Sequence, residues 1–276
     1  MLFYPHTQGV ALRVGVFDSG VGGLSVLRAL HELLPDAALH CVADSAHTPY
    51  GERDEAYVVE RSTRIASHLV DRGAELIVMA CNTATAVAVQ PLRERWPALA
   101  IVGVEPGIKP AIALSRNGRI GVMATAGTLA SAKFRRLMQD HAHGIQLHLQ
   151  ACTDLAAAIE RGELDDPALL DLIETHCRPL RDARVDTVVL GCTHYAFVRS
   201  HIQAALGADV QIVDTALAVA RRAAGLLEMG RGVMLERGAP AEVLLETTGD
   251  PMLLQHIARR WLDFDCRVTA MPEEVG

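Results

Sequence analysis

A short internal repeat constrains the fold of this chain more than any other feature. The run RVGVFDSG from Arg13 corresponds to RIGVMATA from Arg119, and ELIVMACNT from Glu75 corresponds to DTVVLGCTH from Asp186. The segments VGVEP and QIVDT follow in the same order in the two halves. One V-G-V strand alone would mean little because such strands are common, but three ordered matches at nearly one offset indicate two homologous halves.

Each half alternates short β-branched runs with longer segments whose apolar residues recur at helical spacing. This pattern predicts strands over residues 12–17, 38–43 and 75–80, and helices over 21–35 and 54–73. The last of these strands is apolar beyond its first residue, as expected where helices cover both faces of a sheet. Alternation of this kind is typical of parallel α/β sheets.

We therefore predict an α/β fold of two pseudo-symmetric parallel-sheet lobes that face a central cleft. One lobe is expected to contain residues 1–103 and about 214–235, and the other residues 104–213 and about 236–276. Ligands of open parallel sheets bind beyond the carboxyl ends of the strands, so the cleft is expected at those ends.

Two cysteines and an aspartate directly follow apolar runs. Asp18 ends the first run, and Cys81 and Cys192 close equivalent runs in the two halves, so the cysteines are expected to approach the cleft from opposite sides. An isolated cysteine is more often an inert buried residue, but two at equivalent repeat positions weaken that interpretation. Cys81 also precedes Asn82 and Thr83 at a predicted helix start. There the helix N-terminus is expected to lower the thiol pKa, and the amide and hydroxyl groups are suited to a carboxylate.

Other segments contain weaker candidates. FDSGVGGLS places Asp18 and Ser19 at a glycine turn before a helix, which suits an anion. Its glycines match no nucleotide motif, and a tight turn capped by Asp18 is the alternative. TPYGERDE is either a pocket wall or a surface turn. ATAGT, the repeat partner of the Asp-Ser turn, offers hydroxyl groups at Thr125 and Thr128, whereas Glu160 is by pattern alone a solvated carboxylate near a helix end.

Composition argues against several classes of function. The chain has 276 residues and a formal net charge of −7, so a broad basic face for nucleic acid is not expected. No run approaches 18 apolar residues and the N-terminal segment lacks a signal-peptide pattern, so we expect a cytoplasmic protein with no membrane partner. The six cysteines contain no CxxC pair, which argues against a disulfide framework or a structural zinc site. The Cys-x-His pair at Cys192 lacks a third ligand at short spacing, so no metal is expected.

The segments FDSGVGGLSVL, DSAHTPYGER, ACNTAT and LGCTHY, in this order, resemble the glutamate racemases of the aspartate/glutamate racemase superfamily. The resemblance extends from about residue 13 to residue 250. It implies a small-molecule substrate and the cofactor-independent interconversion of L- and D-glutamate, which supplies D-glutamate for peptidoglycan. It also implies that Cys81 and Cys192 are the catalytic pair, and it leaves a homodimer open.

The same resemblance indicates the other site residues. Glu160 is matched within ACTDLAAAIERG, where Thr153 replaces the family's proline, and Ala196 replaces a second proline after Thr-His-Tyr. We expect His194 and Glu160 to serve the second cysteine, and Asp18 to act on the substrate ammonium or on the first cysteine. Together with the hydroxyl groups of ATAGT, the substrate-binding residues are expected to be Asp18, Ser19, Pro49, Tyr50, Gly51, Asn82, Thr83, Thr125, Thr128, Thr193 and His194.

Racemisation removes the α-proton from one face of a carbon and returns a proton on the other, so one base and one acid on opposite sides suffice. Many racemases use pyridoxal phosphate on a lysine, but Lys109 and Lys133 lie outside the paired motifs and no cofactor is expected. The alternatives are a related racemase for aspartate or hydantoins, or a non-catalytic two-lobed amino-acid-binding protein. A one-cysteine decarboxylase is disfavoured because both cysteines are present.

Overall fold

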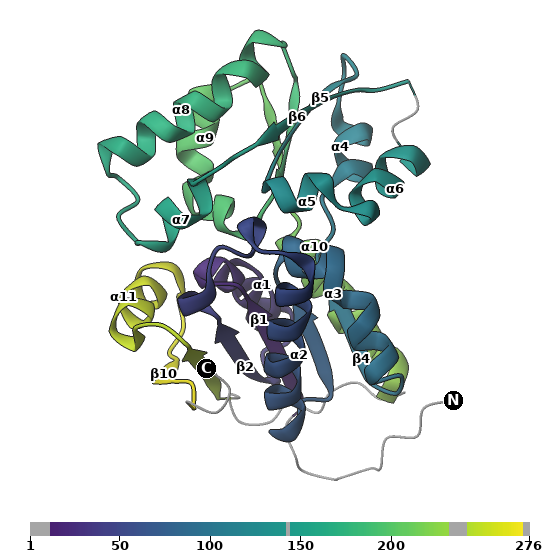
Figure 1. Ribbon diagram of the computed structural model, residues 1–276, viewed down its shortest axis with the longest axis vertical. Helices are drawn as coiled ribbons and strands as arrows, with labels where there is room; N and C mark the ends of the chain where they lie inside the picture. Colours follow the sequence, from purple (N-terminus) through teal and green to yellow (C-terminus); the bar gives the residue numbers. More distant parts are fainter. Residues whose placement is uncertain (1–11, 142–143, 232–241, 273–276) are drawn as a thin grey trace.

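The computed structural model describes residues 12–141, 144–231 and 242–272, which form two α/β lobes (Figure 1). The first lobe contains a six-stranded sheet in the order β10-β9-β2-β1-β3-β4, and the second a four-stranded sheet in the order β6-β5-β7-β8. All paired strands are parallel, so the predicted fold class is confirmed. The strands are β1 (Arg13–Asp18), β2 (Ala38–Ala43), β3 (Leu76–Met79), β4 (Ala100–Gly103), β5 (Arg119–Ala124), β6 (Gln146–Ala151), β7 (Thr187–Gly191), β8 (Gln211–Val213), β9 (Val243–Thr247) and β10 (Arg267–Ala270).

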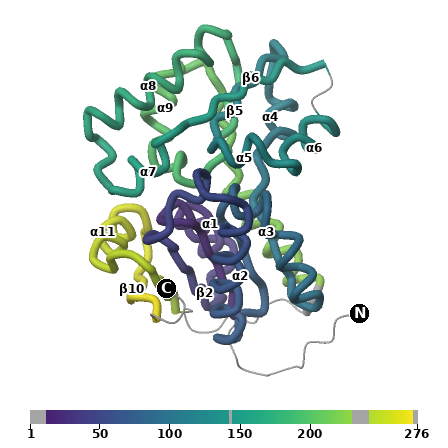
Figure 2. The backbone as a smooth tube through the Cα atoms, in the orientation of Figure 1, coloured from purple at the N-terminus to yellow at the C-terminus, as the bar shows by residue number. Residues whose placement is uncertain are grey.

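The internal repeat of the sequence is visible in the sheet topology. The order β2-β1-β3-β4 of the first lobe recurs as β6-β5-β7-β8 in the second. The repeated segments therefore occupy equivalent places: β1 corresponds to β5, β3 to β7 and β4 to β8. The backbone passes to the second lobe after β4 and returns after β8 (Figure 2).

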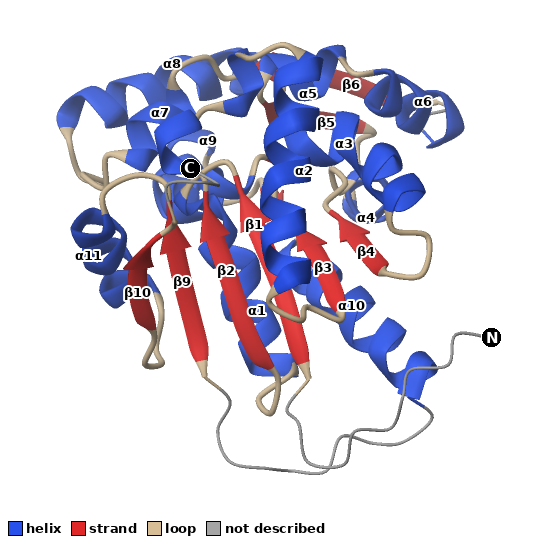
Figure 3. Cartoon of the chain, turned by 60° about the horizontal axis from the view of Figure 1, so that its bottom comes forward, coloured by secondary structure: helices blue, strands red, loops and turns tan. Residues whose placement is uncertain are grey.

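Helices cover both faces of the first sheet (Figure 3). The side chains of β1 alternate between these faces, because Val16 packs in the core beneath α1 and α10 while Phe17 packs beneath α2 and α3. The helices of this lobe are α1 (Leu24–Leu33), α2 (Glu55–Asp71), α3 (Asn82–Arg95), α10 (Ala216–Arg231) and α11 (Pro251–Trp261). Those of the second lobe are α4 (Ile108–Leu114), α5 (Ala126–Ala130), α6 (Ala132–His141), α7 (Leu155–Glu160), α8 (Pro167–Asp182) and α9 (Arg199–Leu206). In the described parts of the chain, no helix is both long and apolar enough to cross a membrane.

The helix predicted over residues 54–73 is confirmed as α2, which begins at Glu55 and ends at Asp71. Asp54 caps α2 by accepting a hydrogen bond from the Tyr57 N–H, and Gly73, with a φ of 84°, lies two residues beyond its last turn. The helix predicted over 21–35 instead begins as the 3₁₀ turn η1 (Val21–Gly23) before α1. That tight turn lies at the lobe contact described below.

The assignment of the C-terminal segment to the second lobe was wrong. The expected range of about 236–276 includes β9, α11 and β10, and β9 pairs with β2 of the first lobe in parallel. The physical reason lies in the two edge positions. The strand β2 is mostly buried and needs a neighbour on its outer side, whereas the equivalent β6, QLHLQA, has no buried residue and forms the edge of its sheet.

Candidate active site

The carboxyl ends of both sheets meet where the two lobes touch. Asp18 ends β1, Cys81 lies two residues beyond the end of β3, and Cys192 directly follows β7, so all three lie at strand ends, as predicted. The edge expected to be a cleft is closed in this structure by direct contacts between the lobes, and Cys81 and Cys192 are only 5% and 8% exposed. Both sulfur atoms therefore lie at the buried contact between the lobes.

The first cysteine lies in a short relay of hydrogen bonds from the first lobe. The Cys81 thiol donates to Ser19 Oγ over 3.7 Å, and Ser19 Oγ donates to Asp18 Oδ1 over 3.2 Å. Cys81 is also the N-cap of α3, where its Sγ accepts from the Ala84 N–H at 3.4 Å. Burial raises the pKa of Asp18, although its hydrogen bonds and the nearby His194 oppose this.

The expected lowering of the Cys81 pKa by the helix N-terminus was wrong. Burial, and next the charge of Asp18, raise the pKa of Cys81 well above its ordinary value. The hydrogen bond from the Ala84 N–H acts in the opposite direction and is outweighed. Cys81 is therefore held as a thiol in this closed arrangement.

The second cysteine has different partners. His194 Nδ1 lies 3.8 Å from Cys192 Sγ, and His194 Nε2 donates to Glu160 Oε2 over 2.7 Å. Burial lowers the pKa of His194, but its contacts with Cys192 and Glu160 outweigh burial and raise that pKa well above its ordinary value. The imidazole is therefore stabilised in its protonated form, with Nδ1 facing the Cys192 sulfur.

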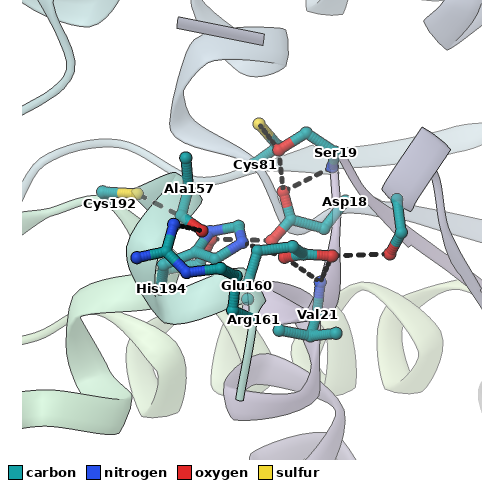
Figure 4. Close-up of polar contacts among 12 residues, drawn as sticks. Asp18, Ser19, Val21, Cys81, Ala157, Glu160, Arg161, Cys192 and His194 are labelled. Carbon is teal, nitrogen blue, oxygen red and sulfur yellow. Dashed lines mark hydrogen bonds and ion pairs between the residues drawn. The ribbon is translucent and has the colours of Figure 1, made fainter. Parts of the chain in front are cut away.

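The carboxylates of Asp18 and Glu160 each accept hydrogen bonds from the opposite lobe (Figure 4). Thr193 Oγ1 of the second lobe donates to Asp18 Oδ2 of the first over 2.7 Å. The Glu160 carboxylate accepts from the Val21 N–H and from Ser45 Oγ, both in the first lobe. In Figure 4, Cys192 lies at the left beside His194, and Cys81 lies above Ser19 and Asp18.

The glycine turn after β1 leaves room for side chains of the opposite lobe. A Cβ at Gly20 would lie 2.3 Å from Glu160 Oε2, and one at Gly22 would lie 2.5 Å from His194 Nδ1. Both distances are shorter than real contacts allow, so glycine at these positions permits the lobes to close. The glycines of this turn therefore allow close contact between the lobes.

The remaining predicted residues gather beside the Cys81 half of the site. Pro49 precedes the 3₁₀ turn η3 (Tyr50–Glu52), and the buried Tyr50 donates to Asp44. A Cβ at Gly51 would lie 2.6 Å from Cβ of Thr125, so this loop packs closely against the start of α5. The hydroxyl group of Thr83 lies 3.0 Å from that of Thr125 and 3.3 Å from that of Thr128, so these three predicted residues lie together.

Asn82 is the clearest candidate for direct contact with a ligand. Its side chain is buried, at 5% exposure of the residue, and its Nδ2 has no hydrogen-bond acceptor among the described residues. A buried amide without an acceptor is unfavourable by about 1–3 kcal/mol, so such groups are rare unless a ligand or water completes them.

Sequence reasoning missed three residues that organise this region. Asp44 follows β2 at the same sheet edge and accepts two hydrogen bonds from Arg61 of α2, at 2.7 and 3.0 Å. The rule that selected Asp18, a carboxylate directly after an apolar strand, would also have selected Asp44. Ser45 lies in the DSAHTPYG segment, but nothing in the sequence indicates its contact with Glu160, because that residue belongs to the other lobe.

A separate group of possible metal ligands lies between α2 and the first sheet. Of the residues that the structure describes, only His40, His68 and Glu246 form a cluster of at least three such side chains close enough to share an ion. Arg72 donates to His68 Nδ1 over 2.7 Å, which leaves the ring proton on Nε2, where it points to Glu246. His40 Nε2 contacts the same carboxylate oxygen at 2.7 Å. Hydrogen bonds therefore account for this cluster.

The model of the Asp/Glu/Hydantoin racemase family matches residues 15–223. The chain belongs to this family of isomerases.

Glutamate racemases are prominent among its similar proteins. The chain is 49% identical over 214 residues to glutamate racemase of Ectopseudomonas mendocina, covering 78% of this chain and 81% of that one. It is 44% identical over 260 residues to glutamate racemase of Pseudomonas entomophila, covering 94% and 97%. Glutamate racemase RacE1 of Bacillus anthracis superposes with a TM-score of 0.85 at 30% identity, covering 96% and 99% of the two chains. Escherichia coli glutamate racemase, in complex with L-glutamate and the activator UDP-MurNAc-Ala, gives 0.82 at 32% identity, covering 94% and 100%.

Proposed function

We propose that this chain interconverts L- and D-glutamate without a cofactor and supplies D-glutamate for peptidoglycan precursors. The observation that carries the proposal is the pair of buried cysteines at matching strand ends of the two lobes, each with its own proton-handling partners. Its similarity to named glutamate racemases supports glutamate over aspartate or a hydantoin as substrate. A cytoplasmic location and an amino-acid ligand rather than nucleic acid are part of the proposal, in keeping with the net charge of −7.

In the proposed reaction, L-glutamate loses its α-proton to the thiolate of Cys192, and the thiol of Cys81 donates a proton to the opposite face of the carbanion. The reverse direction exchanges the two roles, so the cysteines titrate as a coupled pair. The raised pKa of Cys81 supports its start as the acid, and the raised pKa of His194 supports a thiolate at its neighbour.

The carbanion is stabilised in this proposal by neutral donors and by the substrate's own ammonium group. Asn82, Thr83 and Thr193 lie at helix starts beside the cysteines, and the Nδ2 of Asn82 is suited to a substrate carboxylate. Hydroxyl and amide donors bind the carboxylates without stabilising the substrate more than the carbanion that forms from it. Asp18 is suited to the ammonium group because its carboxylate is buried beside Cys81.

Circular dichroism of the purified protein tests the activity directly. L-glutamate, L-aspartate and a hydantoin are supplied separately, with no cofactor added. The proposal expects rapid loss of optical activity with glutamate and at least 100-fold lower kcat/KM with the other two. Preferred turnover of aspartate or the hydantoin would assign the chain to a sister activity, and ligand binding without turnover would indicate a binding protein.

The roles of the two cysteines need a half-reaction assay. The equilibrium constant of racemisation is one, so kcat/KM of the full reaction falls equally in both directions for any variant. Elimination of a β-leaving group from L- and D-glutamate analogues needs a base on one face of the α-carbon and loss of the leaving group, but no acid that returns a proton to the other face. Cys192→Ser is expected to slow elimination from the L-analogue by about 100-fold more than from the D-analogue, and Cys81→Ser to do the reverse. Equal losses from both enantiomers would contradict the assignment.

A further inference from the structure

The Glu160 carboxylate belongs to the second lobe but is held mainly by the first. Ser45 Oγ donates to Glu160 Oε1 over 2.6 Å, and the Val21 N–H donates to Oε2 at 2.9 Å and to Oε1 at 3.2 Å. Among the contacts that the structure describes, the partner from its own lobe is His194 Nε2, which donates to Oε2 over 2.7 Å. The carboxylate therefore joins the lobe contact to the histidine beside Cys192.

Ser45 is placed by a buried framework rather than by a free loop. It begins the 3₁₀ turn η2 (Ser45–His47) directly after Asp44, whose buried carboxylate accepts from Arg61. Thr248 Oγ1 accepts from the Ala46 N–H at 3.1 Å and donates to Asp44 Oδ1 at 3.0 Å. The Ser45 hydroxyl is thus preorganised to meet Glu160 when the lobes are in contact.

We propose that Ser45 is a positioning residue that couples closure of the lobes to the positive charge on His194. The proposal rests on the racemase function proposed above. Donors from the first lobe stabilise Glu160 as a carboxylate, and the carboxylate, aimed at Nε2, stabilises the imidazolium that faces Cys192. Separation of the lobes would remove the donors of Ser45 and Val21 together. Cys192 is then favoured as a base only in the closed site, around bound substrate.

The pH dependence of kcat/KM for Ser45→Ala tests this coupling. Loss of this hydrogen bond to a charged group is expected to lower kcat/KM about tenfold. The titratable groups that face His194 are Glu160, Cys192 and, from the first lobe, Asp18. Ser45→Ala removes a partner of Glu160 alone, so the alkaline limb, where His194 loses its proton, is expected to move to lower pH by about one unit. Ser45→Thr keeps the hydroxyl group and is expected to remain within about threefold of the unmodified enzyme.

Two further variants separate positioning from structural loss. Ser115→Ala removes a similar bond, from Ser115 Oγ to Asp186 Oδ1 at 2.7 Å, outside the site, and is expected to leave the alkaline limb unmoved. Ser45→Cys preserves the size of the side chain and weakens the donor, so it should shift the limb like Ser45→Ala and keeps the test decisive if the alanine variant unfolds.

A double variant tests whether Ser45 acts through Glu160. In a Glu160→Gln background, Ser45→Ala is expected to change kcat/KM by less than about twofold, because the carboxylate that it positions is gone. Additive effects, or an alkaline limb that is the same in Ser45→Ala, Ser45→Cys and the unmodified enzyme, would overturn the inference. Absence of glutamate racemisation in the unmodified chain would instead overturn the proposed function.

Discussion

Gly20→Ala, in the glycine turn after β1, is expected to lower kcat/KM strongly while changing the free energy of unfolding much less. Gly20 has a φ of −170°, an extended conformation that alanine adopts readily, so the backbone itself does not oppose the substitution. The added methyl group would lie 2.3 Å from Glu160 Oε2 and 2.6 Å from its Cδ. The carboxylate must move by about 1 Å to restore an ordinary contact.

Displacement of the Glu160 carboxylate is expected to weaken its hydrogen bonds. The carboxylate is buried and held by Val21, Ser45 and His194, so it cannot move without lengthening at least one charge-assisted hydrogen bond. Weakening one or two such bonds is expected to reduce transition-state stabilisation by about 3 kcal/mol, which corresponds to about 100-fold in kcat/KM. The free energy of unfolding should change less, by up to about 2 kcal/mol, because the crowded atoms belong to one side chain.

The assay compares kcat/KM for glutamate with thermal unfolding in Gly20→Ala and a matched variant. Gly225→Ala adds the same methyl group within α10, where nothing lies within 4 Å of the new Cβ, and should keep full activity with slightly increased stability. A Gly20→Ala enzyme whose activity stays within threefold of the unmodified one would refute the steric argument. So would a loss of activity accompanied by an equal loss from Gly225→Ala.

Two further predictions concern an amide at the site and a buried carboxylate elsewhere in the first lobe. Asn82→Ala is expected to raise the KM for glutamate about tenfold with little change in melting temperature, because a substrate carboxylate would accept from an amide that has no acceptor among the described residues; an unchanged KM would exclude that contact. Burial raises the pKa of Glu246, but its hydrogen bonds with His40 and His68 outweigh burial and lower the pKa to about 2. The ionised carboxylate therefore stabilises the fold fully above pH 4.5 and loses that effect as the pH falls towards 2, a contribution of about 3 kcal/mol. Urea denaturation should show Glu246→Gln less stable at pH 7 by about this amount and flatter between pH 5 and 2 than the parent; parallel curves would contradict the prediction.

The two cysteines occupy equivalent positions of the repeat but have different neighbours. The repeat predicted two equivalent thiols, and the lobes do place them at equivalent strand ends. Their surroundings differ, however, because Cys81 lies beside the carboxylate of Asp18 and Cys192 beside the imidazole of His194. Two cysteines related by pseudo-symmetry thus have different charged neighbours, which suits the one-base, one-acid reaction proposed above.

The sequence by itself determined the lobes, the parallel sheets and the strand ends that carry Asp18, Cys81 and Cys192. These features follow from local periodicity and from the repeat, which are present in the order of residues along the chain. It could not determine the neighbour of β2, because strand pairing across about 200 residues depends on which edge remains unburied. The tertiary structure alone decided that Gly20 gives room to Glu160, that Ser45 donates to it, and that burial raises the Cys81 pKa. Each of these depends on two lobes meeting, and the distances and desolvation that arise at such a contact are not encoded in any single segment.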